Sequence, residues 1–89
     1  MNPAYRVAFL PAAERQLAKL PADARQRILR RAIRLEAEPR PRGVVKLAGP
    51  EELYRVRVGD YRIIYQVHDR DVLVLVVAIG HRREVYRTK

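Results

Sequence analysis

A β-hairpin is predicted in Leu53-Tyr54-Arg55-Val56-Arg57-Val58-Gly59-Asp60-Tyr61-Arg62-Ile63-Ile64-Tyr65-Gln66-Val67, where two alternating runs flank Gly59-Asp60. A two-residue turn there sets the register: Val58 faces Tyr61, Arg57 faces Arg62, and Arg55 faces Ile64. Because side chains alternate along a strand, Arg55, Arg57 and Arg62 share one face, and the apolar and aromatic residues share the other. Two arginines directly opposite each other repel, so the sequence predicts that an anion binds on their face.

A third strand is predicted from Val72 to Ile79, where aliphatic and β-branched residues follow one another almost without a break. This composition is typical of a central strand that is buried on both faces. An antiparallel return brings Gly80 beside Tyr61 and Arg62, so the tail residues His81, Arg82 and Tyr86 start beside the arginine face. His68 lies about six residues away along its strand, roughly 20 Å at the usual strand rise.

The remaining sequence predicts one short strand, two helices and one further strand. The strand covers Tyr5 to Phe9, and the first helix runs from Pro11 to Leu20. The second runs from about Ala22 to Glu38 and ends at Pro39-Arg40-Pro41. Its apolar stripe consists of Ala24, Ile28, Ala32 and Leu35, widened by Leu29 and Ile33. A strand follows from Gly43 to Ala48.

This order, β-α-α-β-β-β-β, predicts a small α+β domain over residues 1–89. An N-terminal helical hairpin packs on a mainly antiparallel, twisted sheet, and a short tail or helix follows. Arginines gather on the outer side of the second helix, where they are either solvated surface or a contact for ribosomal RNA or an acidic protein. They are Arg25, Arg27, Arg30, Arg31 and Arg34.

Charge and composition narrow the partner class. The 89 residues contain 19 Lys and Arg against 10 Asp and Glu, a net charge of +9, and 16 of the 19 cations are arginine. Arginine's planar fork suits phosphate, so nucleic acid is the leading partner, and a solvated basic surface is the alternative. With no cysteine and two distant histidines, we expect no metal site and no cofactor. The apolar runs are too short for a signal peptide or a membrane span, so a cytoplasmic protein is expected.

Several strings, in this order and spacing, resemble the RelE/ParE toxin superfamily of toxin-antitoxin pairs. They are Leu20-Pro21 before the Arg-rich helix, Glu38-Pro39, Lys46-Leu47-Ala48-Gly49, Leu53-Tyr54-Arg55-Val56-Arg57, Gly59-Asp60-Tyr61-Arg62-Ile63-Ile64-Tyr65 and Gly80-His81-Arg82-Arg83-Glu84-Val85-Tyr86. The resemblance implies a RelE-like mRNA interferase. Such a toxin cuts mRNA in the ribosomal A site without metal, by attack of the ribose 2′-OH, and leaves a 2′,3′-cyclic phosphate.

The resemblance also implies partners and residue roles. A RelB-like antitoxin neutralises the toxin, and the complex binds operator DNA through the antitoxin. Arg57 occupies a basic position of the third strand, Arg62 matches the arginine that holds the scissile phosphate, Arg82 the one that serves the leaving 5′-oxygen, and Tyr86 the tyrosine that stacks on the nucleotide. Arg55, Arg83 and Lys46 are expected to contact the substrate.

The general base is the least certain assignment, because arginine essentially never deprotonates in proteins. His81 titrates in the useful range and is the first candidate, with Glu51, Glu52 or Glu84 as a supporting carboxylate. Two alternative functions remain open. One is a ParE-like inhibitor of DNA gyrase with the same fold, and the other is a basic RNA-binding module without catalysis.

Overall fold

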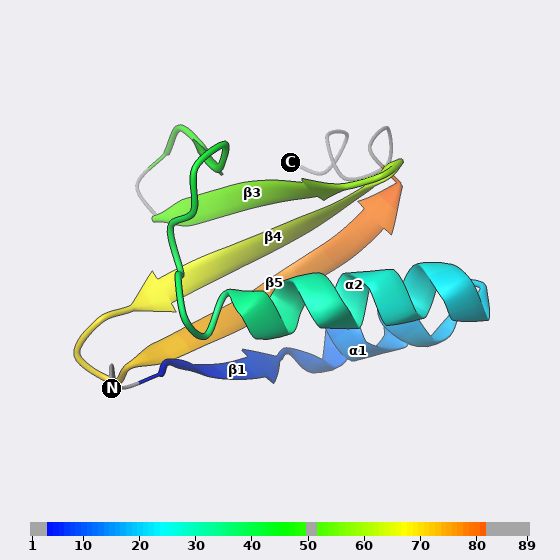
Figure 1. The fold of residues 1–89 in the computed structure, drawn as a ribbon, viewed down its shortest axis with the longest axis horizontal. Coiled ribbons are helices and arrows are strands. Elements are labelled where there is room, and N and C mark those ends of the chain that lie inside the picture. The colour runs from blue at the N-terminus through cyan, green and yellow to red at the C-terminus, as the bar shows by residue number, and fades with distance from the viewer. Residues whose placement is uncertain (1–3, 50–51, 82–89) are drawn as a thin grey trace.

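The sheet is mixed and five-stranded, and two helices lie in the chain between its first and second strands. The computed structural model describes residues 4–49 and 52–81. Its elements are β1 (Arg6–Phe9), α1 (Pro11–Ala18), α2 (Ala22–Arg34), β2 (Val45–Lys46), β3 (Leu53–Val58), β4 (Tyr61–His68) and β5 (Leu73–His81). The strand order is β1-β5-β4-β3-β2, with β1 parallel to β5 and the other neighbours antiparallel. Figure 1 shows this arrangement, which confirms the predicted α+β class and element order.

The hairpin formed by β3 and β4 has the predicted register. Val58 pairs with Tyr61, Arg57 with Arg62, and Arg55 with Ile64. Gly59 has a φ of 59°, and among the described residues only Val72 has a positive φ without being glycine. A positive φ at the first turn residue alone defines a type II′ turn, whose twist matches that of the flanking strands. The turn therefore fixes which arginines face each other.

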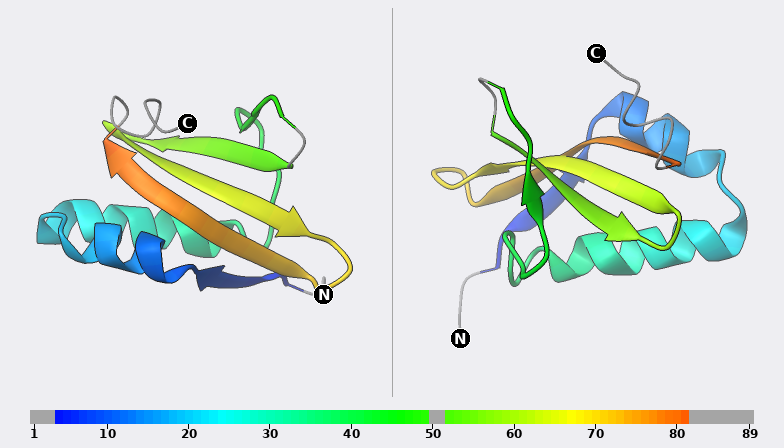
Figure 2. Two further views of the ribbon diagram at one scale, coloured as in Figure 1. Left: turned by 180° about the vertical axis from the view of Figure 1, so that it is seen from behind. Right: turned by 90° about the horizontal axis from the view of Figure 1, so that it is seen from above.

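Both helices cover the same face of the sheet, as Figures 1 and 2 show. The core between them contains Ala13, Ala24, Ile28, Ala32, Leu35, Tyr54, Val56, Ile63, Tyr65, Val67, Val74, Val76 and Ile79. The predicted apolar stripe of α2 is thus confirmed, but its widening is wrong. Leu29 is 36% exposed and Ile33 is 58% exposed, because the sheet lies against only one side of the helix.

The prediction that β5 is buried on both faces is wrong. Val74, Val76 and Ile79 are buried on the helix side, whereas Leu73, Leu75 and Val77 are only half-buried. The reason is that the described helices lie on one side of the sheet, so the other side stays open. We call the side away from the helices the open face.

Two predicted elements are shorter in the structure. The second helix ends at Arg34 rather than Glu38, and the amides of Leu35 and Glu36 donate to carbonyls three residues back, which tightens the last turn. The strand predicted from Gly43 to Ala48 is reduced to β2, a two-residue edge strand. None of the helices among residues 4–49 and 52–81 is long and apolar enough to cross a bilayer.

A polar cluster holds the loop after α2 against the sheet. Arg40 donates to both carboxylate oxygens of Asp69, at 3.2 and 2.9 Å, and to the Tyr54 hydroxyl at 3.0 Å. The Tyr5 hydroxyl donates to the same carboxylate at 2.7 Å. The guanidinium of Arg40 and the hydroxyl of Tyr5 hold the pKa of Asp69 below its usual range. The chain is therefore tied at the end of the sheet opposite the Gly59 turn.

Tyr65 should make stability sensitive to alkaline pH. Burial raises its pKa to about 12, and its hydroxyl donates to the Pro39 carbonyl at 2.7 Å. A folded-state pKa above the unfolded value of about 10 gives stability that is complete below pH 10 and is lost as pH rises toward 12. Tyr65→Phe should reduce this loss and cost about 1 kcal/mol at pH 7. Thermal unfolding at pH 7, 10 and 11.5 measures both, and identical alkaline loss in both proteins would contradict the assignment.

Candidate functional site

The arginines of the hairpin form a row across the open face. Arg57 of β3 pairs with Arg62 of β4, and Arg62 pairs with Gly80 of β5. Directly opposed residues share a face of the sheet, so these three positions lie side by side, and we call them the arginine row. Gly80 has no side chain, which leaves room over β5 beside Arg62. The next row contains Arg55, Ile64 and Ala78, so β5 is again small where it faces the hairpin.

The two facing guanidinium groups are held differently. Arg57 is exposed and donates from Nε to the Gly59 carbonyl at 3.1 Å. Arg62 is half-buried, and its Nε is shielded from solvent. The side chain of Arg57 is therefore tied to the turn, while that of Arg62 is supported by surrounding protein. An anion over Gly80 would meet two guanidinium groups whose bases are fixed.

His81 lies at the same end of the sheet but on the opposite face. It is the last residue of β5 and pairs with Tyr61, whose side chain packs against the core on the helix side. The two rings meet edge to face, with centroids 5.8 Å apart and planes at 77°. The structure thus does not bring His81 to the arginine row. Alternation along β5, applied from Gly80, was the signal in the sequence that separates them.

Lys46 is also separated from the row. It pairs with Tyr54 on the helix side, and its Nζ lies 3.8 Å from Glu52 Oε2. Arg55, in contrast, lies on the open face one row away from Arg57. The predicted residues Arg82, Arg83 and Tyr86 lie outside the described residues. Within the described ranges there is no group of three or more metal-ligating side chains that could hold a metal ion.

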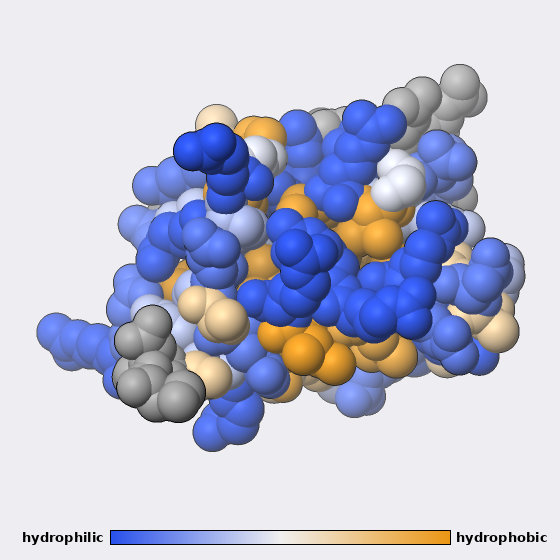
Figure 3. Space-filling view, in the orientation of Figure 1, coloured by the Kyte–Doolittle hydropathy of each residue, from blue (hydrophilic) through white to orange (hydrophobic). Residues whose placement is uncertain are grey.

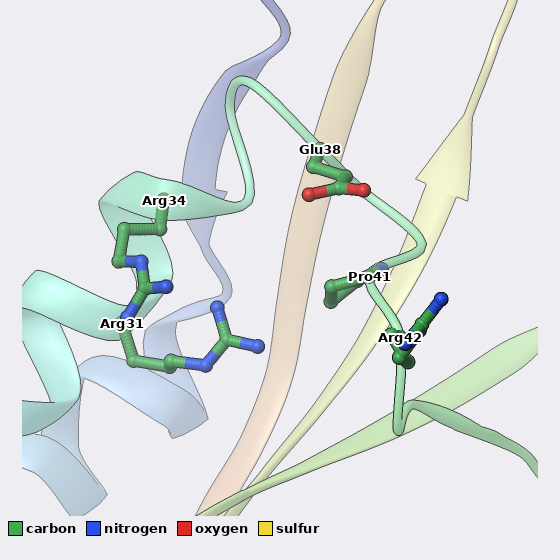
Figure 4. A pocket seen from close by; sticks show the side chains of 5 residues that line it. All are labelled: Arg31, Arg34, Glu38, Pro41 and Arg42. Carbon is green, nitrogen blue, oxygen red and sulfur yellow. The ribbon is translucent and has the colours of Figure 1, made fainter.

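Sequence reasoning did not find a basic pocket on the helix side. A cavity of about 220 Å³ lies between the end of α2 and the following loop, lined by Arg31, Arg34, Glu38, Pro41 and Arg42. Figure 4 shows Arg31 and Arg34 projecting from the helix into the space before the loop, and Glu38 pointing back toward the helix. The signal was present in the sequence as two arginines three residues apart followed by Pro39-Arg40-Pro41-Arg42.

Comparisons with known proteins place the chain in a family. The family model described as the ParE toxin of type II toxin-antitoxin systems matches residues 7–86. The chain is 31% identical over 87 residues to the mRNA interferase toxin RelE of Escherichia coli (strain K12), covering 93% of this chain and 90% of that protein. It is also 31% identical over 88 residues to the toxin RelG of Mycobacterium tuberculosis, covering 93% and 97%.

Solved structures agree with these relatives. RelE in the archaeal RelE-RelB complex from Pyrococcus horikoshii OT3 is 37% identical, with a TM-score of 0.79 over 89% of this chain and 96% of that chain. The isolated E. coli RelE toxin is 31% identical, with a TM-score of 0.78 over 93% and 92%. Since a family model spans most of the chain and the relatives align over nearly their whole lengths, this chain belongs to the RelE/ParE superfamily of type II toxin-antitoxin toxins.

Proposed function

We propose that the protein is a ribosome-dependent endoribonuclease that cleaves mRNA in the A site. The observation that carries this proposal is the arginine row: Arg57 and Arg62 face each other across β3 and β4, beside the space over Gly80. Two opposed cations weaken a sheet unless they bind an anion, and two guanidinium forks suit the oxygens of one phosphodiester. The relatives named mRNA interferase RelE and toxin RelG support the same function.

In the proposed reaction, the ribose 2′-oxygen attacks the adjacent phosphorus and the bond to the 5′-oxygen breaks. The 2′-OH loses its proton and the leaving 5′-oxygen gains one, which yields a 2′,3′-cyclic phosphate and a 5′-hydroxyl. Arg62 and Arg57 stabilise the charge that develops on the phosphate oxygens, so we propose that no metal is required. Arg82 serves the leaving oxygen and Tyr86 stacks on the nucleotide, as the resemblance implies.

His81 does not join Arg62 on the open face, so we do not assign it as the base from the geometry. Positioning of the mRNA on the ribosome can supply much of the acceleration, because holding reacting groups in place removes an entropic cost of roughly 7–11 kcal/mol in favourable cases. The proposed catalyst is therefore mainly electrostatic and positional, which is compatible with a site built from arginines.

We further propose that a RelB-like antitoxin neutralises the protein in the cytoplasm, where it meets ribosomes and mRNA. The solved complexes of RelE with RelB from P. horikoshii and E. coli support such a partner. The chain's net charge of +9 favours an acidic binding segment. Contact with operator DNA would be indirect, through the antitoxin.

Primer extension on translating ribosomes tests the proposed activity. Added protein should produce new 5′ ends within the A-site codon, and the upstream fragments should carry a 2′,3′-cyclic phosphate. Pre-mixing with the antitoxin encoded beside the gene should abolish the new ends, and Arg82→Ala should reduce them strongly. Intact mRNA at protein concentrations that halt translation would contradict the proposal.

The name of the matching family model favours one second candidate. That model describes ParE toxins, and a ParE-like protein would inhibit DNA gyrase without cutting RNA. A supercoiling assay with purified gyrase separates the two functions. Inhibition of supercoiling together with intact mRNA would select the gyrase inhibitor, whereas codon-specific mRNA cuts with unaffected supercoiling would select the ribonuclease.

A further inference from the structure

A second basic surface runs along the helix side of the molecule. Arg27, Arg31 and Arg34 recur at a spacing of four and three residues on α2, so they follow one side of the helix over about 10 Å. The row ends at the pocket, whose far wall contributes Arg42. We call these four residues the helix track. Figure 3, viewed from the helix side, shows hydrophilic side chains over most of this face, with apolar surface between them.

The track starts beside the candidate active site. The Arg27 guanidinium lies against Gly59, within 3.6 Å of the position that a Cβ would take there. Arg57 donates to the carbonyl of the same glycine from the open face. The tip of the hairpin therefore has one arginine on each side, and a polyanion bound at the arginine row can pass around Gly59 onto α2.

The pocket at the other end of the track is held rigidly. Tyr65 donates to the Pro39 carbonyl at 2.7 Å, and the Val44 amide donates to the Pro41 carbonyl at 3.1 Å. Arg40 anchors the same loop to Asp69. Arg31 is close enough to Tyr65 to lower its pKa, against the larger effect of burial. The wall formed by Pro41 and Arg42 is thus fixed before any ligand binds.

Three pocket cations are available to a ligand. Among the described residues, the ion pairs are Arg40 with Asp69 and Lys46 with Glu52, so Arg31, Arg34 and Arg42 form none with a described carboxylate. Three guanidinium groups against the single carboxylate of Glu38 leave the pocket positive. Its volume of about 220 Å³ is below the roughly 300–1,000 Å³ of pockets for drug-sized ligands, which suits a phosphate group and its waters.

We propose that the helix track binds the phosphate backbone of RNA, with one phosphate seated among Arg31, Arg34 and Arg42. The inference deepens the proposed function, on which it rests, by extending RNA contact beyond the cleaved bond. A continuous line of cations ending in a pocket matches the repeating charge of a nucleic-acid strand. An isolated acidic side chain of a protein would use only the pocket and would leave the rest of the track without a role.

Binding of a 2′-O-methyl RNA 20-mer tests the track without any cleavage, because that RNA lacks the attacking hydroxyl. In the full chain, Arg31→Gln, Arg34→Gln and Arg42→Gln combined should weaken binding about tenfold at physiological salt. The slope of log K against log salt should fall by about 0.7 for each phosphate lost. A matched variant, Arg15→Gln, Lys19→Gln and Arg70→Gln, removes the same charge from exposed sites and should change affinity less than twofold.

Equal losses in the two variants would overturn the proposal, because charge alone would then explain binding. Unchanged RNA affinity with weaker antitoxin binding would overturn it in favour of an acidic protein ligand. If the triple variant unfolds at a lower temperature than wild type, the single Arg42→Gln variant, which lies outside the helices and strands, gives the decisive slope. Arg62→Ala should abolish cutting yet leave the slope contribution of the track, so failure of the nuclease proposal would be seen separately.

Discussion

Replacing Arg62 with alanine should lower A-site mRNA cleavage by on the order of 100-fold or more. Arg62 occupies the middle of the arginine row, between Arg57 and Gly80, and its Nε is shielded from solvent. Removing it takes away the guanidinium best placed to receive a phosphate in a partly dry setting, where electrostatic interactions are strongest. Primer extension at saturating ribosome concentration gives the rate for wild type and variant.

Two controls make the result specific to the guanidinium group. Arg62→Lys keeps the charge but not the planar fork, so it should recover only part of the activity. Arg15→Ala removes an exposed arginine from α1 and should leave the rate within about twofold. A rate for Arg62→Ala close to wild type, with normal thermal stability, would remove the arginine row from the mechanism.

Truncating Tyr65 to alanine should lower the free energy of unfolding by about 3–5 kcal/mol. Tyr65 is the largest of the fully buried side chains. Its ring stacks on Tyr54 with centroids 5.8 Å apart and planes at 26°, and its hydroxyl holds the Pro39 carbonyl. The substitution opens a cavity under α2 and releases the loop that forms the wall of the pocket. Urea unfolding at pH 7 measures the change.

A matched substitution separates burial from the loss of an aromatic ring as such. Tyr61 lies four residues earlier in the same strand and is only half-buried, so Tyr61→Ala should cost markedly less than Tyr65→Ala. Equal losses at the two positions would show that the core is not centred on Tyr65. Because Tyr61 also contacts His81, its variant further reports whether that ring contact matters to the end of β5.

Much of the hairpin was predictable from its residues because a two-residue turn and a period of two leave only one register. Arg57 therefore faces Arg62 in the structure, as the positions around Gly59-Asp60 require. The family resemblance was carried by the same strings and is confirmed by the match to residues 7–86. The buried stripe of α2 followed from its helical spacing.

The remaining features depended on which elements pack together. Val72 to Ile79 reads equally well as a strand buried on two faces or on one, since composition does not count the layers above it. Leu29 and Ile33 are apolar yet exposed, because one sheet can cover only part of a helix. The pocket formed by Arg31, Arg34 and Arg42 required the loop after α2 to fold back, which no local pattern specifies.

The sequence by itself determined the hairpin, its register and the opposition of two arginines, because these follow from turn geometry and alternation within fifteen residues. Only the tertiary structure decided that both helices cover one face of the sheet. That choice places His81 and Lys46 on the helix side, away from the arginine row. The physical reason is that alternation defines two faces of a strand, whereas burial of apolar surface between distant segments selects which face is covered.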